Sequence, residues 1–168
     1  YVWDLPGLKS SHALIRTVLG GWQTNGILMI RSGTPVNVTT GNDVNLDGKT
    51  GDRPDLVGSP VLSQDRSRAE RIAANFNTAA FAAPVTGSIG TAGRNLFYGP
   101  GSMTWDTTLM KNFAVRENHR ITVRAEFFNA PNRVNLGNPT GTRNNANFGR
   151  ILSTDSARVV QLALRYGF

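Results

Sequence analysis

The stretch VVQLALRYGF, residues 159–168, ends the chain and alternates apolar with small or polar side chains. Successive side chains of a β-strand point to opposite faces, so a period of two gathers the apolar ones on a single face. The ending therefore predicts a strand over about residues 158–168 with one continuous apolar face. That face consists of Val160, Leu162, Leu164, Tyr166 and Phe168.

The same alternation predicts four further strands, separated by segments rich in Gly, Asn, Asp and Pro. We expect them over residues 1–5, about 22–39, about 103–113 and 120–129. The separation of polar from apolar side chains is clearest in the last of these, where Ile121, Val123, Ala125 and Phe127 alternate with Thr122, Arg124, Glu126 and Phe128.

A short helix is predicted inside the segment SQDRSRAERIAANF, residues 63–76. Ser67 is followed three residues later by Glu70, which is the spacing of a capping box, and apolar residues then recur at helical spacing. The helix interrupts a segment of about residues 40–102 that otherwise reads as one long loop.

The predicted connections are very unequal in length. Only about residues 113–119 join the third and fourth strands, whereas about residues 40–102 separate the second from the third. Outer-membrane barrels have short periplasmic turns and longer extracellular loops. This pattern predicts a periplasmic turn at 113–119 and an extracellular loop at 40–102.

Composition limits the other possibilities. The chain has 18 Lys and Arg against 11 Asp and Glu, but the cations are dispersed, which does not favour a nucleic-acid partner. There is no cysteine for a disulfide framework or a thiol site. No apolar run approaches the roughly 20 residues that a membrane-spanning helix needs.

Two folds fit strands with one apolar and one polar face. One is an antiparallel transmembrane β-barrel, whose lipid-facing side is apolar and whose lumenal side is polar. The other is a soluble, secreted β-sandwich that serves in adhesion or carbohydrate binding, with Trp22 or Trp105 stacking on sugar. Aromatic residues at strand ends, the unequal connections and the terminal Phe168 together favour the barrel. We therefore predict an all-β barrel segment of about five strands, with one short helix in a long extracellular loop.

Several segments carry a family resemblance in their order and spacing. The chain resembles the C-terminal end of the barrel of TonB-dependent outer-membrane receptors, in particular the Oar-like group that begins with a carboxypeptidase-regulatory-like domain. The segments are YVWDLPG, LGGWQTNGI, SGTPVNV, DRPDLVG, FNTAAF, GRNLFYGPG, WDTTLMKNF, RAEFFNAPNRVNLGNP, NFGRI and the closing strand.

The resemblance implies a role in the bacterial outer membrane. The full protein would be a 22-stranded barrel, closed by a plug and energised by the TonB complex, and residues 1–168 would be the C-terminal part of that barrel domain. The implied partners are outer-membrane lipid, the barrel-assembly machinery, the rest of the receptor chain and an unidentified small-molecule or oligomeric substrate. The apolar face of the last strand resembles the signal that the assembly machinery reads.

An Asp-rich stretch in the predicted extracellular loop suggests a calcium site. In GNDVNLDGKTGD, Asp43, Asn45 and Asp47 fall at positions 1, 3 and 5 of an EF-hand-type loop, with Gly48 at position 6. Position 12 holds no Glu, so Asp52 would have to supply a further oxygen. The alternative is an Asp-, Asn- and Gly-rich turn without an ion.

Charged residues on the polar face form a second candidate site. We expect Asp106, Arg124 and Glu126 to lie near one another on the lumenal side, as a polar wall of the substrate path or as a cross-strand ladder of ion pairs. Arg165 belongs to the same face. The sequence contains no metalloprotease, Walker or G-x-S-x-G motif, so we do not expect an enzyme, and no cofactor is predicted apart from the calcium considered above.

Overall fold

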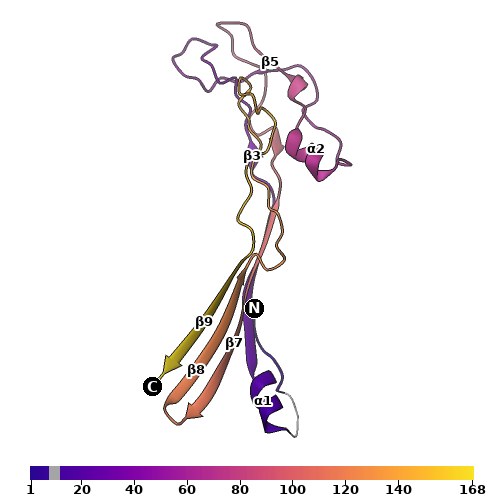
Figure 1. Ribbon diagram of the computed structural model, residues 1–168. Coiled ribbons are helices and arrows are strands. Elements are labelled where there is room, and N and C mark those ends of the chain that lie inside the picture. The colour runs from indigo at the N-terminus through magenta and orange to yellow at the C-terminus, as the bar shows by residue number, and fades with distance from the viewer. Residues whose placement is uncertain (8–11) are drawn as a thin grey trace. The chain divides into compact units, whose positions relative to one another are not determined.

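The computed structural model describes residues 1–7 and 12–168, and its largest element is a five-stranded sheet (Figure 1). Neighbouring strands lie in the order β1-β2-β7-β8-β9, and the β1–β2, β7–β8 and β8–β9 pairs are antiparallel. The prediction of five strands in a mostly β, antiparallel fold is confirmed. The strands are β1 (Val2–Asp4), β2 (Trp22–Arg31), β7 (Ser102–Arg116), β8 (His119–Phe128) and β9 (Val159–Gly167).

The chain divides into two compact units. The first unit contains the sheet and consists of Tyr1–Ile30, Met103–Val134 and Ser156–Phe168. The second unit consists of Arg31–Ser102 and Asn135–Asp155. Among the described residues, no helix is long and apolar enough to cross a membrane.

Strand register confirms the predicted faces of the sheet. Alternate residues of β8 pair with alternate residues of β9, so the apolar sets of both strands occupy the same face. The set on β7 that pairs with them continues this face across a third strand. The paired rows are Leu109–Ala125–Leu162 and Phe113–Ile121–Tyr166, together with Val123–Leu164 and Phe127–Val160.

The turn between β7 and β8 is shorter than predicted. β7 runs to Arg116 and β8 begins at His119, so Glu117 and Asn118 alone form the turn, instead of about residues 113–119. A register shift between Ala114 and Arg116 accompanies the turn. A bulge of this kind increases the local twist of the two strands.

The second predicted strand is too long. β2 ends at Arg31, and Pro35–Val36 forms a separate strand, β3, that pairs with β6 (Phe97–Tyr98). A Cβ at Gly33 would lie 1.7 Å from the carbonyl oxygen of Gly99, so only glycine permits the two backbones to approach so closely. The chain leaves β2 at this point, and the alternation in the sequence conceals the break.

One helix of the first unit was not predicted. α1 (Ala13–Leu19) lies in the connection between β1 and β2, where only a loop was expected. Its N-cap, His12, makes no side-chain capping bond, so the usual signal of a helix start is missing. The helix ends at Gly20, whose N–H donates to the carbonyl oxygen of Arg16.

The second unit contains the predicted helix and several short elements. α2 (Arg68–Ala73) begins at Ser67, and the capping box with Glu70 is confirmed because both of its reciprocal bonds are present. The 3-10 helix η1 (Thr78–Ala80) leads into β5 (Phe81–Ala82), which pairs with β4 (Asp55–Leu56).

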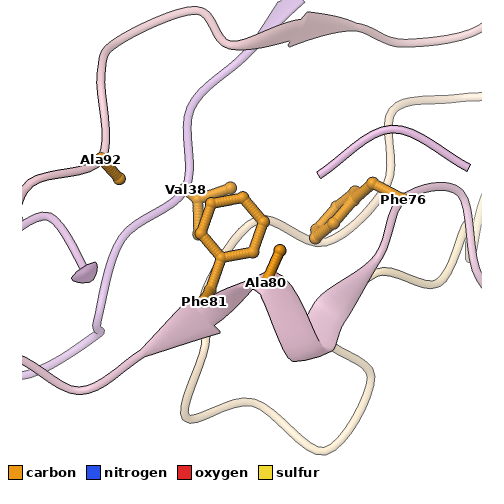
Figure 2. Close-up of a cluster of buried hydrophobic side chains, with 5 residues drawn as sticks. All are labelled: Val38, Phe76, Ala80, Phe81 and Ala92. Carbon is orange, nitrogen blue, oxygen red and sulfur yellow. The ribbon is translucent and has the colours of Figure 1, made fainter. Parts of the chain in front are cut away.

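The second unit has its own hydrophobic core (Figure 2). The rings of Phe76 and Phe81 meet edge to face, with centroids 5.7 Å apart, and Phe148 packs 5.2 Å from Phe76. Such aromatic pairs add about 0.5–1.5 kcal/mol to the stabilisation from burial. The predicted long loop is therefore a packed structure. The buried core residues of the second unit are Val38, Phe76, Ala80, Phe81 and Ala92.

Candidate functional site

The apolar face of the sheet is exposed along β9. Leu162 is 78% exposed, Leu164 76% and Phe168 93%, so no second layer of the described chain covers them. Fully burying a Leu side chain is worth about 1.5–3 kcal/mol relative to leaving it in water. A row of such residues on an ordered strand is therefore suited to an apolar medium. The five predicted assembly residues all lie on this strand or at its end, and each is at least half-exposed.

An aromatic cluster lies at the end of this face that is next to the β7–β8 turn. Tyr166 on β9 shares a hydrogen bond with Nδ1 of His119 on β8, and the two rings stack with centroids 5.7 Å apart. Phe168 lies next to them, with its ring centroid 5.9 Å from that of Tyr166. Membrane barrels carry girdles of aromatic residues where the apolar band meets the interface. The cluster is in the position expected for such a girdle.

On the opposite face, the structure brings together two of the predicted charged residues. The Nε of Arg124 lies 3.5 Å from Oε1 of Glu126, and this is the one ion pair among the described residues. Both belong to β8, so the pair runs along a strand and not between strands as the ladder prediction required. With the Arg124 side chain 47% exposed, solvent screening limits the pair to about 0–1 kcal/mol.

Asp106 is engaged elsewhere. Its Oδ1 accepts a 2.8 Å hydrogen bond from the backbone N–H of Asn129, just beyond the end of β8. Asn129 has a φ of 51°, and its side chain bonds both to the N–H and to the carbonyl oxygen of Arg133. Asp106 therefore helps to fix the turn that follows β8, which is a structural role.

Arg165 lines a hollow on the polar side of the turn end. The hollow has a volume of about 500 Å³, and Arg116, Arg120 and Arg165 give it a cationic lining together with Glu117 and His119. Arg165 pairs in register with Thr122, so it shares the face of Arg124 and Glu126. The structure thus places Arg165 on the predicted polar wall, but near its end.

The four predicted calcium ligands lie in one loop whose oxygens accept backbone hydrogen bonds. Asp43 accepts from Asp47 and Gly48, at 3.1 and 2.8 Å, and Asn45 accepts from Asp47. Asp52 accepts from the two N–H groups of residues 44 and 45. Among the described residues, no group of three or more His, Cys, Asp or Glu could hold a metal ion. This geometry favours the turn interpretation, and the calcium site stays a prediction.

A polar hollow adjoins this loop within the second unit. It measures about 440 Å³, and Asp47, Asp52, Lys49, Arg53 and Arg94 contribute charges of both signs to its lining. Arg53 also donates to the carbonyl oxygen of Ala92, so one wall is tied to the core of the unit. A hollow with convergent charged groups can bind a polar ligand.

One charged residue on the apolar face was not predicted. Lys111 pairs with Val123, so it shares the face of the lipophilic residues, yet it is only 4% exposed. Its ammonium group donates to the carbonyl oxygens of Val18 and Gly20. The parity of Lys111 with Leu109 and Phe113 could have revealed it, because all three are odd positions of one strand.

The sequence also matches a known protein family. Residues 1–161 match the family model described as an outer membrane beta barrel domain. The chain belongs to this family. Membership places it in the bacterial outer membrane and confirms the predicted localisation, and it favours the barrel over the soluble sandwich. No curated protein sequence and no solved structure matches the chain.

Proposed function

We propose that the chain forms the C-terminal strands of a TonB-dependent outer-membrane receptor and transporter. The observation that carries this proposal is the inequality of the connections. Two residues join β7 to β8, whereas a segment with its own hydrophobic core separates β2 from β7. A long loop with its own core offers a surface on which a receptor can bind its substrate. The order of the TonB-receptor-like segments in the sequence supports the same assignment.

The two faces of the sheet then have different surroundings. The face of Leu162 and Leu164 contacts lipid, because its side chains are exposed and apolar. The face of Arg124, Glu126 and Arg165 lines the lumen, where a plug and the passing substrate would meet it. The β7–β8 turn is periplasmic, and the second unit is extracellular.

The second unit supplies a ligand contact in this proposal. Its polar hollow presents Lys49 and Arg94 beside Asp47 and Asp52, which suits a ligand that carries polar or charged groups. The remaining recognition surface would come from the plug and from other loops. Energy for uptake would reach the receptor through TonB, which contacts a different part of the receptor.

The terminal strand has a further role in assembly. Its five apolar positions form an exposed row that ends in Phe168, and they match the spacing of the signal read by the barrel-assembly machinery. Because β9 pairs with β8 alone in the described chain, its outer edge is available to another strand. Assembly would close that edge.

Growth competition tests the transport proposal even though the substrate is unidentified. Bacteria with and without the protein would be grown on single siderophores, oligosaccharides or peptides as the limiting nutrient, each with and without a working TonB. We expect a defect on one class of nutrient that equals the defect of the TonB mutant and is not additive with it. A defect that persists additively without TonB would contradict the proposal.

A further inference from the structure

Helix α1 is amphipathic, and no residue that the structure describes covers its apolar side. At 100° per residue, its four large apolar residues span an arc of about 140°, with Arg16 and Thr17 outside that arc. No residue of the helix is buried. Its apolar residues and their exposed fractions are Leu14 (81%), Ile15 (44%), Val18 (52%) and Leu19 (58%).

The polar side of α1 faces a hollow against the sheet. The hollow measures about 430 Å³, and Arg16 and Thr17 of the helix line it together with Lys111, Asn112 and Phe113 of β7. Arg16 and Thr17 are themselves exposed, so neither side of α1 is buried, whereas a surface helix of a water-soluble protein buries its apolar stripe. An apolar stripe that no protein covers is stabilised by contact with an apolar medium.

The C-terminal end of α1 is bonded to the sheet. The ammonium of Lys111 donates to the carbonyl oxygens of Val18 and Gly20, and Nε1 of Trp22 donates to the oxygen of Val18 at 3.0 Å. A cation is favoured at a helix C-terminus, where the last carbonyl groups lack partners. The ammonium also lies 5.7 Å from the ring centroid of Trp22 and 5.0 Å from that of Phe113.

These contacts explain why the apolar face tolerates Lys111. A lysine on the lipid face costs about 2–4 kcal/mol at the bilayer midplane and about 0–1 kcal/mol near the interface. Lys111 lies toward the turn end of β7, and its charge is enclosed by carbonyl oxygens and aromatic rings. The sheet thus holds α1 on its apolar face through a cation that donates hydrogen bonds to the carbonyl oxygens at the helix end.

We propose that α1 is an interfacial helix whose partner is the phospholipid of the membrane leaflet at the β7–β8 turn end. Acyl chains would pack on Leu14, Ile15, Val18 and Leu19, with the helix axis near the level of the headgroups. Continuity with the exposed apolar face of the sheet supports lipid as the occupant. The inference rests on the proposed lipid-facing orientation of that face.

Site-directed spin labelling tests this directly, and residues 1–168 contain no cysteine that would compete for the label. Leu14→Cys and Val18→Cys would be labelled one at a time in the assembled outer-membrane protein, reconstituted in vesicles of phosphatidylethanolamine and phosphatidylglycerol. Collision rates with oxygen, which enriches in lipid, and with a water-soluble nickel chelate would be measured. We expect both labels to show oxygen-to-chelate ratios several times that of a label at Asn118→Cys in the turn.

Two matched labels make the failures distinguishable. Val123→Cys reports on the lipid face of the sheet, and Thr17→Cys reports on the polar side of α1, where we expect a lower ratio than at Val18. If Val123 reports lipid but Leu14 and Val18 match Asn118, the interfacial helix is wrong and the barrel orientation stands. If Val123 also reports water, the proposed orientation itself fails. Shielding of Leu14 and Val18 from both reagents would indicate a protein partner, such as a second copy, and would overturn the lipid assignment.

A separate experiment tests whether Lys111 holds α1 on the sheet. Lys111→Met removes the ammonium that bonds the helix carbonyls but keeps an apolar side chain of similar length. We expect the label at Val18 to become more mobile, while a label at Leu162→Cys, which does not pair next to Lys111, keeps its spectrum. Unchanged mobility at Val18 would show that Lys111 does not hold the helix and would overturn that part of the proposal.

Discussion

The two units of the molecule treat large apolar side chains differently: the first exposes them, and the second buries them. In the first unit, Leu162 and Leu164 lie on the outside of an ordered sheet, more than three-quarters exposed. In the second unit, Phe76 and Phe81 are almost completely enclosed. Burial of apolar side chains is favourable when the surrounding medium is water, and it gains little when that medium is itself apolar. The comparison teaches that the exposed face of the first unit is suited to an apolar medium, whereas the second unit has a buried apolar core of its own.

The largest effect is expected from the core of the second unit. Phe76→Ala should destabilise that unit by about 3–5 kcal/mol, since it removes a buried ring and leaves a cavity among three other phenylalanines. Amide hydrogen exchange would measure the loss of protection in the second unit. Ile89→Ala is the control, because Ile89 is 70% exposed and should change little. Equal effects of the two substitutions would show that burial of Phe76 does not stabilise the second unit.

A charge on the lipid face should have the next largest effect. Leu162→Arg should cost about 2–4 kcal/mol if the residue lies near the bilayer midplane, and it should reduce the amount of folded protein in the outer membrane. Heat-modifiable migration on gels would report the folded fraction.

Gln161→Arg is the matched control for this prediction. Gln161 lies on the opposite face and pairs with Glu126, so the new cation would meet a carboxylate. We expect normal assembly for this variant. Equal loss in both variants would mean that the two faces of β9 have the same surroundings and would break the comparison.

A smaller effect is expected in the Asp-rich loop. Asp52→Ala leaves the N–H groups of Val44 and Asn45 without their acceptor, which should cost about 1–3 kcal/mol of local stability. Hydrogen exchange of these two amides, with and without added calcium, provides the measurement. We expect the same cost in both conditions, because the carboxylate is already bonded to the backbone. Protection that rises with calcium in the parent protein but not in the variant would support the ion site.

The smallest effect concerns pH and the start of α2. Hydrogen bonds from Ser67, first from its side chain and then from its backbone, lower the pKa of Glu70 below its ordinary value of 4.5. Because the folded-state pKa is the lower one, the stabilisation is fully present above that ordinary value and is lost as pH falls through the folded-state pKa.

The amide of Ser67 should therefore lose protection from exchange as the solution is acidified through this range. Glu70→Gln should remove this part of the pH dependence, because an amide does not titrate. An unchanged pH profile in the variant would show that another group is responsible.

Patterns within a few residues predicted much of this protein correctly. The faces of β8 and β9 followed from alternation alone, since the period of a strand is fixed by its backbone geometry. The start of α2 followed from Ser67 and Glu70, because a capping box needs only three residues of spacing. The contacts between the residues of the predicted polar wall were predicted less well. Arg124 pairs with Glu126 on its own strand. Asp106 instead accepts a hydrogen bond from the backbone N–H of Asn129, which lies near it only because the chain turns after β8.

The sequence by itself determined the class of fold, the two faces of the strands and the resemblance to outer-membrane receptors. Only the tertiary structure decided where distant residues meet. Val38, Phe76 and Phe148 form one core although long stretches of sequence separate them, and Lys111 reaches α1 across more than 90 positions. Local spacing determines local geometry, whereas contacts across such separations depend on how the whole chain balances burial against the entropy of closing long loops.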